Sequence, residues 1–217
     1  MSIDQLQQQL NDGLVVLRLN HSHVIQQLLL RYIQLLIEWN KVYNLTAIKK
    51  PEEILIKHIL DSLSISIYLK GDSILDVGTG AGLPGIPLAI VNPDKRFVLL
   101  DSNSKKTRFL YHVKQQLSLD NIEIVTNRVE AFTTNDGFDN IVTRAYATLK
   151  EFTGSTQHLL KEQGQFLAMK GLYPESELSE IIKKFSVVTV QELIVPFLNA
   201  ERHLVCIVKR NNQLEAK

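Results

Sequence analysis

The sequence of 217 residues contains a single cysteine, Cys206, and no marked excess of either charge. One cysteine excludes an internal disulfide and a cysteine zinc cluster, and such sparing use is typical of a reducing cytoplasm. Lys and Arg total 24 against 23 Asp and Glu, which gives a formal net charge of +1. Because a global basic field is absent, any binding of nucleic acid must come from a local patch.

Long hydrophobic runs are also missing. No stretch approaches the ~20 apolar residues that cross a bilayer, and residues 1–10 lack the basic-then-apolar pattern of a signal peptide. We therefore expect no membrane segment. No metal site is predicted either, because His58 and Asp61, three residues apart on one helix face, have no evident third ligand.

Two patterns divide the chain. Residues 1–70 carry apolar residues at helical spacing, with a further helix beginning at Pro51, and are predicted to form a helical extension. Residues 71–217 are predicted to form an α/β domain in which strands and helices alternate, which indicates a mostly parallel sheet covered on both faces. The expected strands span 73–77, 96–101, 122–126, 138–143, 164–170, 186–195 and 202–209, and the expected helices span 84–91, 104–117, 149–160 and 175–185.

The last two strands are joined by too few residues for a helical crossover, so we expect them to be antiparallel. Seven strands with one antiparallel member near an edge are the topology of the Rossmann-like class I methyltransferases. A ligand of this fold should lie beyond the carboxyl ends of the strands.

A glycine-rich stretch follows the first expected strand. Glycines occupy positions 78, 80, 82 and 85, after the short run Ile74-Leu75-Asp76-Val77, which is apolar except for Asp76. A strand, a glycine turn and a helix bring backbone close to a nucleotide-like ligand. Asp76 lies at the strand end, where an acid attracts the ammonium group of S-adenosylmethionine and repels a pyrophosphate. The motif therefore favours S-adenosylmethionine.

A dinucleotide is the alternative ligand. Gly80, Gly82 and Gly85 fit the spacing G-x-G-x-x-G, and Asp101 follows at about the distance of a ribose-binding acid. The first glycine of that match, Gly80, comes three residues after the expected strand end at Val77, whereas the dinucleotide motif directly follows its strand. This offset argues against the dinucleotide.

Further candidates follow the other strands. Asp101 would accept hydrogen bonds from ribose hydroxyls, unless it only caps the next helix. Val129 and Glu130 would contact adenine through a backbone amide and a carboxylate, unless Glu130 is only a helix-start acid. Arg144 would orient the cofactor carboxylate or a guanine O6, and Tyr146 would offer a stacking face, unless both only shape the rim of the pocket.

Two motifs that are absent from the sequence limit which kind of atom could accept a methyl group. After the fourth strand there is no Asn/Asp-Pro-Pro-Tyr/Phe stretch of the kind that binds an exocyclic amine, and Cys206 lies in an apolar strand that indicates packing. An acceptor that is already nucleophilic, such as guanine N7, needs proximity and alignment rather than acid–base help. Basic residues that would hold RNA phosphates, or else form solvated helix faces, are Lys49, Lys50, Lys105, Lys106 and Arg108.

Several segments together resemble one known family, the ribosomal RNA small subunit methyltransferase G family, also called glucose-inhibited division protein B. The resemblance covers nearly the whole chain, and the segments that carry it are Trp39–Thr46, Lys57–Ser62, Asp76–Leu88, Arg144-Ala145, Met169–Gly171 and Glu201–Val205.

The resemblance implies a bacterial cytoplasmic enzyme that methylates N7 of guanine 527 in 16S rRNA, in a small-subunit context, with S-adenosylmethionine. It maps cofactor contacts to Gly78, Leu83, Val129–Glu130 and Arg144, and Arg144 is our candidate catalytic residue. The segment Ser102–Lys106 departs from the family pattern, which often has glycine where Ser104 stands. We expect a monomer.

Three other functions remain open at this point. A methyltransferase acting on a small molecule or a protein would use the same cofactor loop. A binding module would dock on RNA without transferring a methyl group. A nicotinamide-dependent dehydrogenase would follow from the dinucleotide alternative.

Overall fold

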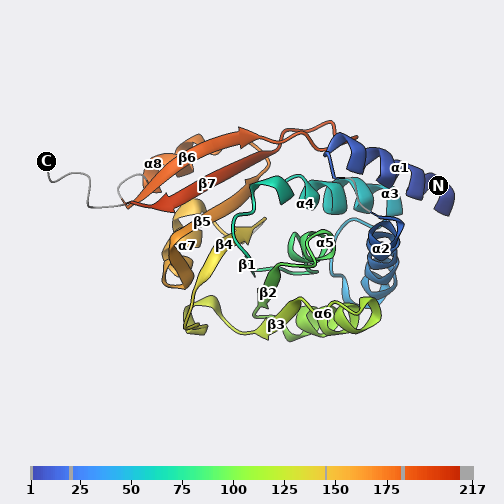
Figure 1. The fold of residues 1–217 in the computed structure, drawn as a ribbon, viewed down its shortest axis with the longest axis horizontal. Coiled ribbons are helices and arrows are strands. Elements are labelled where there is room, and N and C mark those ends of the chain that lie inside the picture. Colours follow the sequence, from blue (N-terminus) through green and yellow to red (C-terminus); the bar gives the residue numbers. More distant parts are fainter. Residues whose placement is uncertain (1, 20–21, 145, 182–183, 211–217) are drawn as a thin grey trace, which may run out of the picture.

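A seven-stranded sheet forms the centre of the structure, a computed structural model that describes residues 2–19, 22–144, 146–181 and 184–210 (Figure 1). The strand order is β3-β2-β1-β4-β5-β7-β6. The strands are β1 (Ser73–Val77), β2 (Arg96–Asp101), β3 (Ile122–Thr126), β4 (Phe138–Thr143), β5 (Leu160–Lys170), β6 (Phe185–Glu192) and β7 (His203–Lys209).

Strands β1 to β5 pair in parallel, whereas β7 is antiparallel to both β5 and β6. The predicted antiparallel final pair is thus confirmed. Because β7 runs opposite to β5, the start of β7 lies beside the end of β5, and Lys170 pairs with His203. Residues that begin β7 therefore reach the same edge of the sheet as residues that end β1, β2, β4 and β5.

The expected helical cover on both faces is also confirmed. One face packs against α1 (Ile3–Val16), α2 (His23–Tyr43), α5 (Gly85–Val91) and α6 (Ser104–Leu117), and the other against α7 (Leu149–Thr156) and α8 (Glu175–Ile181). Successive side chains of a strand point to opposite faces, so Ile74 belongs to the first core and Leu75 to the second. Among the described residues, no helix is both long and apolar enough to span a bilayer.

The helix predicted to begin at Pro51 changes type along its length. It runs as α3 (Pro51–Ile54), then as the π-helix η1 (Leu55–Leu60), then as α4 (Asp61–Leu63), before the 3₁₀ turn η2 (Ser66–Tyr68). Pro51 occupies the first turn as predicted. Helical spacing alone did not indicate the π segment, which is a rare form found frequently at functional sites. This segment carries Lys57 and His58.

Several predicted boundaries are wrong. β5 begins at Leu160 rather than 164, because Gly164 lets the strand continue where an added Cβ would lie 2.8 Å from the Phe138 carbonyl oxygen. β6 spans Phe185–Glu192 and ends before 195, since Leu193 and Val195 turn into the helical core. β7 begins one residue late, at His203. α7 ends at Thr156 and is followed by the 3₁₀ turn η4 (Gln157–Leu159).

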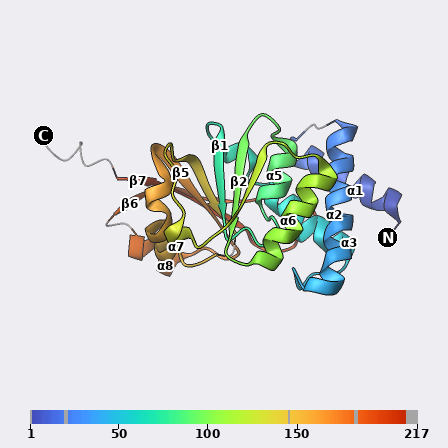
Figure 2. The same ribbon diagram turned by 90° about the horizontal axis from the view of Figure 1, so that it is seen from below.

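The remaining helix bounds are close to those predicted. α6 matches the expected span, and α5 begins at Gly85, one residue later than expected. α8 is described to Ile181, and residues 182–183 of the expected helix lie outside the described residues. Its predicted end at 185 is wrong, because Phe185 already begins β6. Seen from below, the start of α6 and the α2–α3 connection lie on one side of the sheet, the side where the parallel strands end (Figure 2).

Candidate active site

The loop between β1 and α5 is fixed from beneath by Asp76. One carboxylate oxygen of Asp76, Oδ2, accepts hydrogen bonds from the Thr79 hydroxyl at 2.6 Å and from the Gly85 amide at 2.8 Å. The carboxyl is almost completely buried, and this burial raises its pKa to about 7, although both hydrogen bonds oppose the shift. Asp76 thus shapes the loop, while a direct contact with the cofactor ammonium stays a prediction.

Gly78 directly follows β1, so the glycine turn begins where the strand ends. Its φ of +67° is rarely accessible to other residues, and an added Cβ would lie 2.8 Å from Cδ2 of Tyr146. Gly80 also has a positive φ, and its amide donates to Asp101 Oδ2 at 2.9 Å. The backbone of this turn consequently lies close to the end of β2.

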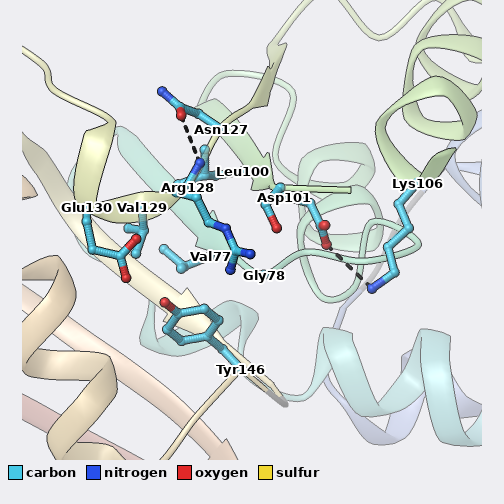
Figure 3. A pocket seen from close by; sticks show the side chains of 11 residues that line it. Val77, Gly78, Leu100, Asp101, Lys106, Asn127, Arg128, Val129, Glu130 and Tyr146 are labelled. Carbon is cyan, nitrogen blue, oxygen red and sulfur yellow. Dashed lines mark hydrogen bonds and ion pairs between the residues drawn. The ribbon is translucent and has the colours of Figure 1, made fainter. Parts of the chain in front are cut away.

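A cavity of about 230 Å³ opens above these strand ends (Figure 3). The ends of β1, β2 and β3 form its floor, the 3₁₀ turn η3 (Val129–Ala131) forms one side, and Tyr146 lies across from them. It is lined by Val77, Gly78, Leu100, Asp101, Ser102, Lys106, Asn127, Arg128, Val129, Glu130 and Tyr146. Four of the predicted cofactor residues, Gly78, Asp101, Val129 and Glu130, therefore meet here.

Asp101 is a buried cavity acid and does not cap a helix. The cap of α6 is Asn103, whose side chain accepts from the Lys105 amide at 3.0 Å. Asp101 Oδ1 accepts from the Asn103 amide at 2.8 Å, and its Oδ2 lies 3.7 Å from the Lys106 ammonium (Figure 3). Each carboxylate oxygen can accept more than one hydrogen bond, so the acid remains able to accept from a sugar.

The residues of this cavity fit S-adenosylmethionine. Asp101 could supply an acceptor for ribose hydroxyls, and Val77, Leu100 and Val129 could supply apolar surface for a base. Glu130 lies at the rim with its carboxylate directed toward Tyr146 (Figure 3). Since Glu130 belongs to a 3₁₀ turn of three residues, it is not the start of an α-helix.

A second cavity, of about 330 Å³, lies at the same edge of the sheet. Arg144 lines this cavity, whereas Tyr146, two residues later in the sequence, lines the first. The second cavity is formed by the π-helix η1, by the ends of β4 and β5, and by the residue before β7. It is lined by Ile48, Lys57, His58, Asp61, Arg144, Met169, Lys170, Gly171 and Arg202.

Asp61 joins two arginines in the wall of the second cavity. Its Oδ1 accepts from Arg202 Nε at 3.0 Å, and its Oδ2 lies 3.4 Å from Nη1 of Arg144, which also donates to the Lys57 carbonyl at 3.1 Å. The Asp61 side chain is only 4% exposed. Burial raises the pKa of this carboxyl, while the two guanidinium groups act in the opposite direction.

His58 in the same wall is held neutral. Its Nε2 lies 2.8 Å from the Thr46 hydroxyl, and its Nδ1 lies 3.0 Å from the Lys57 carbonyl, an arrangement that fits a proton on Nδ1. Burial and the nearby Arg144 charge lower the pKa of His58 to about 4. Both ring nitrogens are thus engaged, so His58 is poorly suited to act as a general base.

The other predicted residues are distributed around these cavities. Arg144 lines the second cavity and not the first, so it lies apart from the four predicted cofactor residues that meet in the first cavity, and its contact with the cofactor stays a prediction. Leu83 is buried in the turn and lines neither cavity. Lys106 lies inside the first cavity, whereas Lys49, Lys50, Lys105 and Arg108 are exposed around the same side of the sheet. Their contacts with RNA stay predictions.

Sequence reasoning missed Lys170 and Arg202 as site residues and gave Asp61 no role. A signal was present, because Lys170 ends β5 and Arg202 precedes β7, and antiparallel pairing brings these positions to one edge. Lys170 also ends in an ion pair with Glu177, at 2.9 Å. Among the described residues, no group of three or more His, Cys, Asp and Glu side chains is arranged to hold a metal ion.

The segments that line both cavities match a known family. The model of the rRNA small subunit methyltransferase G family matches residues 25–205. The chain belongs to this family. It is 50% identical to ribosomal RNA small subunit methyltransferase G of Nitrosococcus oceani over 90% of this chain and 92% of that one. It is 47% identical to the Pasteurella multocida protein of the same name, over 93% and 98% of the two chains.

Solved structures confirm the Rossmann-like methyltransferase fold. A glycopeptide N-methyltransferase complexed with S-adenosylmethionine superposes with a TM-score of 0.62 at 11% identity, covering 71% of this chain and 88% of that chain. The magnesium protoporphyrin IX methyltransferase of Synechocystis, with bound S-adenosylmethionine, gives 0.58 at 14% identity, covering 82% and 97%. These neighbours establish the fold of this family member.

Proposed function

We propose that this chain transfers the methyl group of S-adenosylmethionine to N7 of guanine 527 in the 16S rRNA of the small ribosomal subunit. The observation that carries the proposal is the second cavity, whose His58 is neutral with both nitrogens engaged and whose Asp61 is paired with two arginines. Such a cavity suits an acceptor that has a lone pair and no proton to lose, as guanine N7 has.

The first cavity would hold the cofactor, which supplies an electrophilic methyl group on a sulfonium. Asp101 would accept from the ribose hydroxyls, and Val129 and Glu130 would contact the adenine. The turn at Gly78 would bring its backbone against the methionine part. Asp76 would act from below by fixing the turn through Thr79 and Gly85. Catalysis then rests on proximity and alignment between two adjoining cavities.

The RNA would be held by cations at the carboxyl edge of the sheet. Lys49, Lys50, Lys105 and Arg108 are exposed, and Lys57 lines the second cavity. This local enrichment is compatible with a net charge of +1, because acids elsewhere balance it. We further infer that the enzyme acts as a monomer in the cytoplasm, where ribosomal subunits are available.

The proposal is tested by comparing acceptors with labelled S-adenosylmethionine. Undermethylated small subunits, free nucleosides and a mixture of peptides are each incubated with the protein, and incorporated label is counted. We expect label in the subunits alone. Label in peptides or free nucleosides would favour the alternative methyltransferases, and RNA binding without transfer would favour the binding module. Binding of a nicotinamide dinucleotide, without binding of S-adenosylhomocysteine, would favour the alternative that the protein is a dehydrogenase.

A further inference from the structure

Asp61 combines features that are unusual for a carboxylate that only ties two arginines together. Each of its oxygens has one charged partner, Arg202 on Oδ1 and Arg144 on Oδ2, and the Arg144 contact at 3.4 Å is longer than an ordinary hydrogen bond. Each carboxylate oxygen accepts about two hydrogen bonds. The group therefore lines the second cavity with remaining capacity to accept from a ligand.

We propose that Asp61 binds the Watson–Crick edge of the acceptor guanine, accepting hydrogen bonds from N1–H and from the N2 amine. The inference rests on the proposed function and names the residue that selects its base. Arg202 and Arg144 hold the carboxylate in place. Ile48 and Met169 in the same cavity supply apolar surface for the flat faces of a base.

The chemistry of the cavity discriminates between purines. Guanine presents two donors on its Watson–Crick edge, which match the two oxygens of a carboxylate. Adenine presents an acceptor at N1, whose lone pair would face the negative charge of Asp61, and it lacks the N2 amine. A buried group left without its partner is penalised strongly, so a carboxylate here would reject adenine.

Charge development in the reaction strengthens the same contact. As the lone pair of N7 forms the new N–C bond, the S–C bond breaks, its electron pair stays on sulfur, and the positive charge moves from sulfur to the purine ring. N1–H and the N2 amine then become stronger donors. A buried carboxylate bound to them stabilises the transition state more than the ground state, which is the condition for a faster reaction.

A phosphate is a poorer occupant of the position beside Asp61. The buried carboxylate would repel it, and the two guanidinium groups are already directed at the carboxylate oxygens. Lys57 also lines this cavity and is 44% exposed, so it is better placed to meet the flanking backbone. The base and its phosphates thus have separate partners in this region.

The test is a double-mutant cycle that removes the Asp61 carboxylate from the protein and the N2 amine from the substrate, separately and together. Small subunits are reconstituted with either guanosine or inosine, which lacks the N2 amine, at the acceptor position. Single-turnover rates and binding affinities are measured for the wild type, for Asp61→Asn, and for Glu52→Gln as a control. Glu52 is an exposed carboxylate of α3, part of the same helix.

We expect inosine to react about tenfold or more slowly than guanosine with the wild type and with Glu52→Gln, the usual effect of losing a hydrogen bond to a charged group. With Asp61→Asn, guanosine itself should slow, and the guanosine-to-inosine ratio should fall to about twofold or less. Asp61→Asn should still bind S-adenosylhomocysteine with wild-type affinity, which shows that it folds.

Equal ratios in the wild type and in Asp61→Asn would overturn the inference and leave Asp61 as a positioning group for the arginines. The same conclusion would follow if inosine reacted as fast as guanosine with the wild type. If methyl transfer by Asp61→Asn is too slow to measure, the ratio of its affinities for guanosine-containing and inosine-containing subunits is compared with the wild-type ratio instead. A wild type that methylates neither substrate would instead refute the proposed function, and the role of Asp61 with it.

Discussion

Asp76 and Asp61 are both buried carboxyl groups, and their surroundings separate their roles. The hydrogen-bond donors to Asp76 are neutral, so desolvation dominates and its pKa rises to about 7. Burial raises the pKa of Asp61 as well, but there two guanidinium groups act in the opposite direction. One acid therefore lies beneath the cofactor loop with a pKa of about 7, while the other lies between two cations in the wall of the second cavity.

The raised pKa of Asp76 predicts a pH dependence of folding. The carboxyl binds a proton more tightly in the folded state than in the unfolded state, so its contribution to stability is full below about pH 4 and is lost as pH rises through about 7. The stability of the wild type relative to Asp76→Asn should fall over this window, by an amount on the order of a few kcal/mol. Urea unfolding of both proteins at about pH 5 and about pH 8 measures this. Parallel pH profiles would contradict the assignment.

Gly78 predicts an effect on cofactor binding. Alanine there must adopt a φ near +67° and would approach Tyr146 to 2.8 Å, so we expect Gly78→Ala to weaken S-adenosylmethionine binding about tenfold or more. Gly154 offers a matched control, because it lies in α7 with open space where a Cβ would be added. Gly154→Ala should leave the affinity unchanged and stabilise the fold by about 0.5–1 kcal/mol. Calorimetric titration gives both affinities, and equal values would refute the prediction.

At the residue scale, the sequence located the first cavity well and the second poorly. Gly78 follows β1, Asp101 ends β2 and Glu130 lies shortly after β3, and parallel strands bring such positions together. The second cavity depends on contacts from Asp61 to Arg144 and Arg202, which are 83 and 141 residues away along the chain. No local pattern encodes such pairs.

At the scale of elements, the central strands were predicted to the residue because their runs are short, apolar and bounded by turns. The bounds of β1 to β4 are examples, and the buried interiors of β1 and β2 come nearest to the apolar runs expected of a parallel sheet, whereas the edge strand β3 alternates buried and exposed residues. The π-helix η1 was not predicted, since its apolar spacing resembles that of an ordinary helix. It presents Lys57 and His58 to the second cavity.

Asn40 connects the end of α2 to this π-helix. Its side chain donates to the Thr46 carbonyl and accepts from the Thr46 amide, both at 2.9 Å, and the Thr46 hydroxyl in turn bonds His58. Asn40→Ala would leave these partly buried backbone groups unpaired, so we expect a loss of about 2–4 kcal/mol in unfolding free energy. It should also slow methyl transfer, because the loop that positions His58 loosens.

Chemical denaturation and transfer assays of Asn40→Ala check this, with Asn199→Ala as the control at an exposed loop position. If Asn40→Ala and Asn199→Ala were equally stable and equally active, the loop between α2 and α3 would be independent of the site. A loss of stability without a loss of activity would show that Asn40 stabilises the fold but does not help to position the site.

For the whole molecule, a net charge of +1 is compatible with RNA binding only if cations gather on one side. The helical extension contributes to that side, because its residues 44–50 lie near the start of α6 (Figure 2). The extension also shares one hydrophobic core with α5 and α6. The division into an extension at 1–70 and a domain at 71–217 stays a prediction.

This distribution predicts a salt effect that is local to one edge. Replacing Lys49 and Lys50 with alanine should weaken binding to small subunits and lower the slope of log affinity against log salt by about 1–2. Replacing Lys95 and Arg96, an adjacent pair of cations where β2 begins at the opposite edge, should change neither quantity. Binding titrations at several salt concentrations measure both variants, and equal effects would indicate only a general charge attraction.

The central claim is most directly tested by mapping the modified nucleotide. Undermethylated small subunits are incubated with the protein and labelled S-adenosylmethionine, and the 16S rRNA is then digested and analysed. The account predicts one labelled product, 7-methylguanosine, at position 527. Label on another atom or at another position would contradict it, and so would no label at all from protein that binds S-adenosylmethionine.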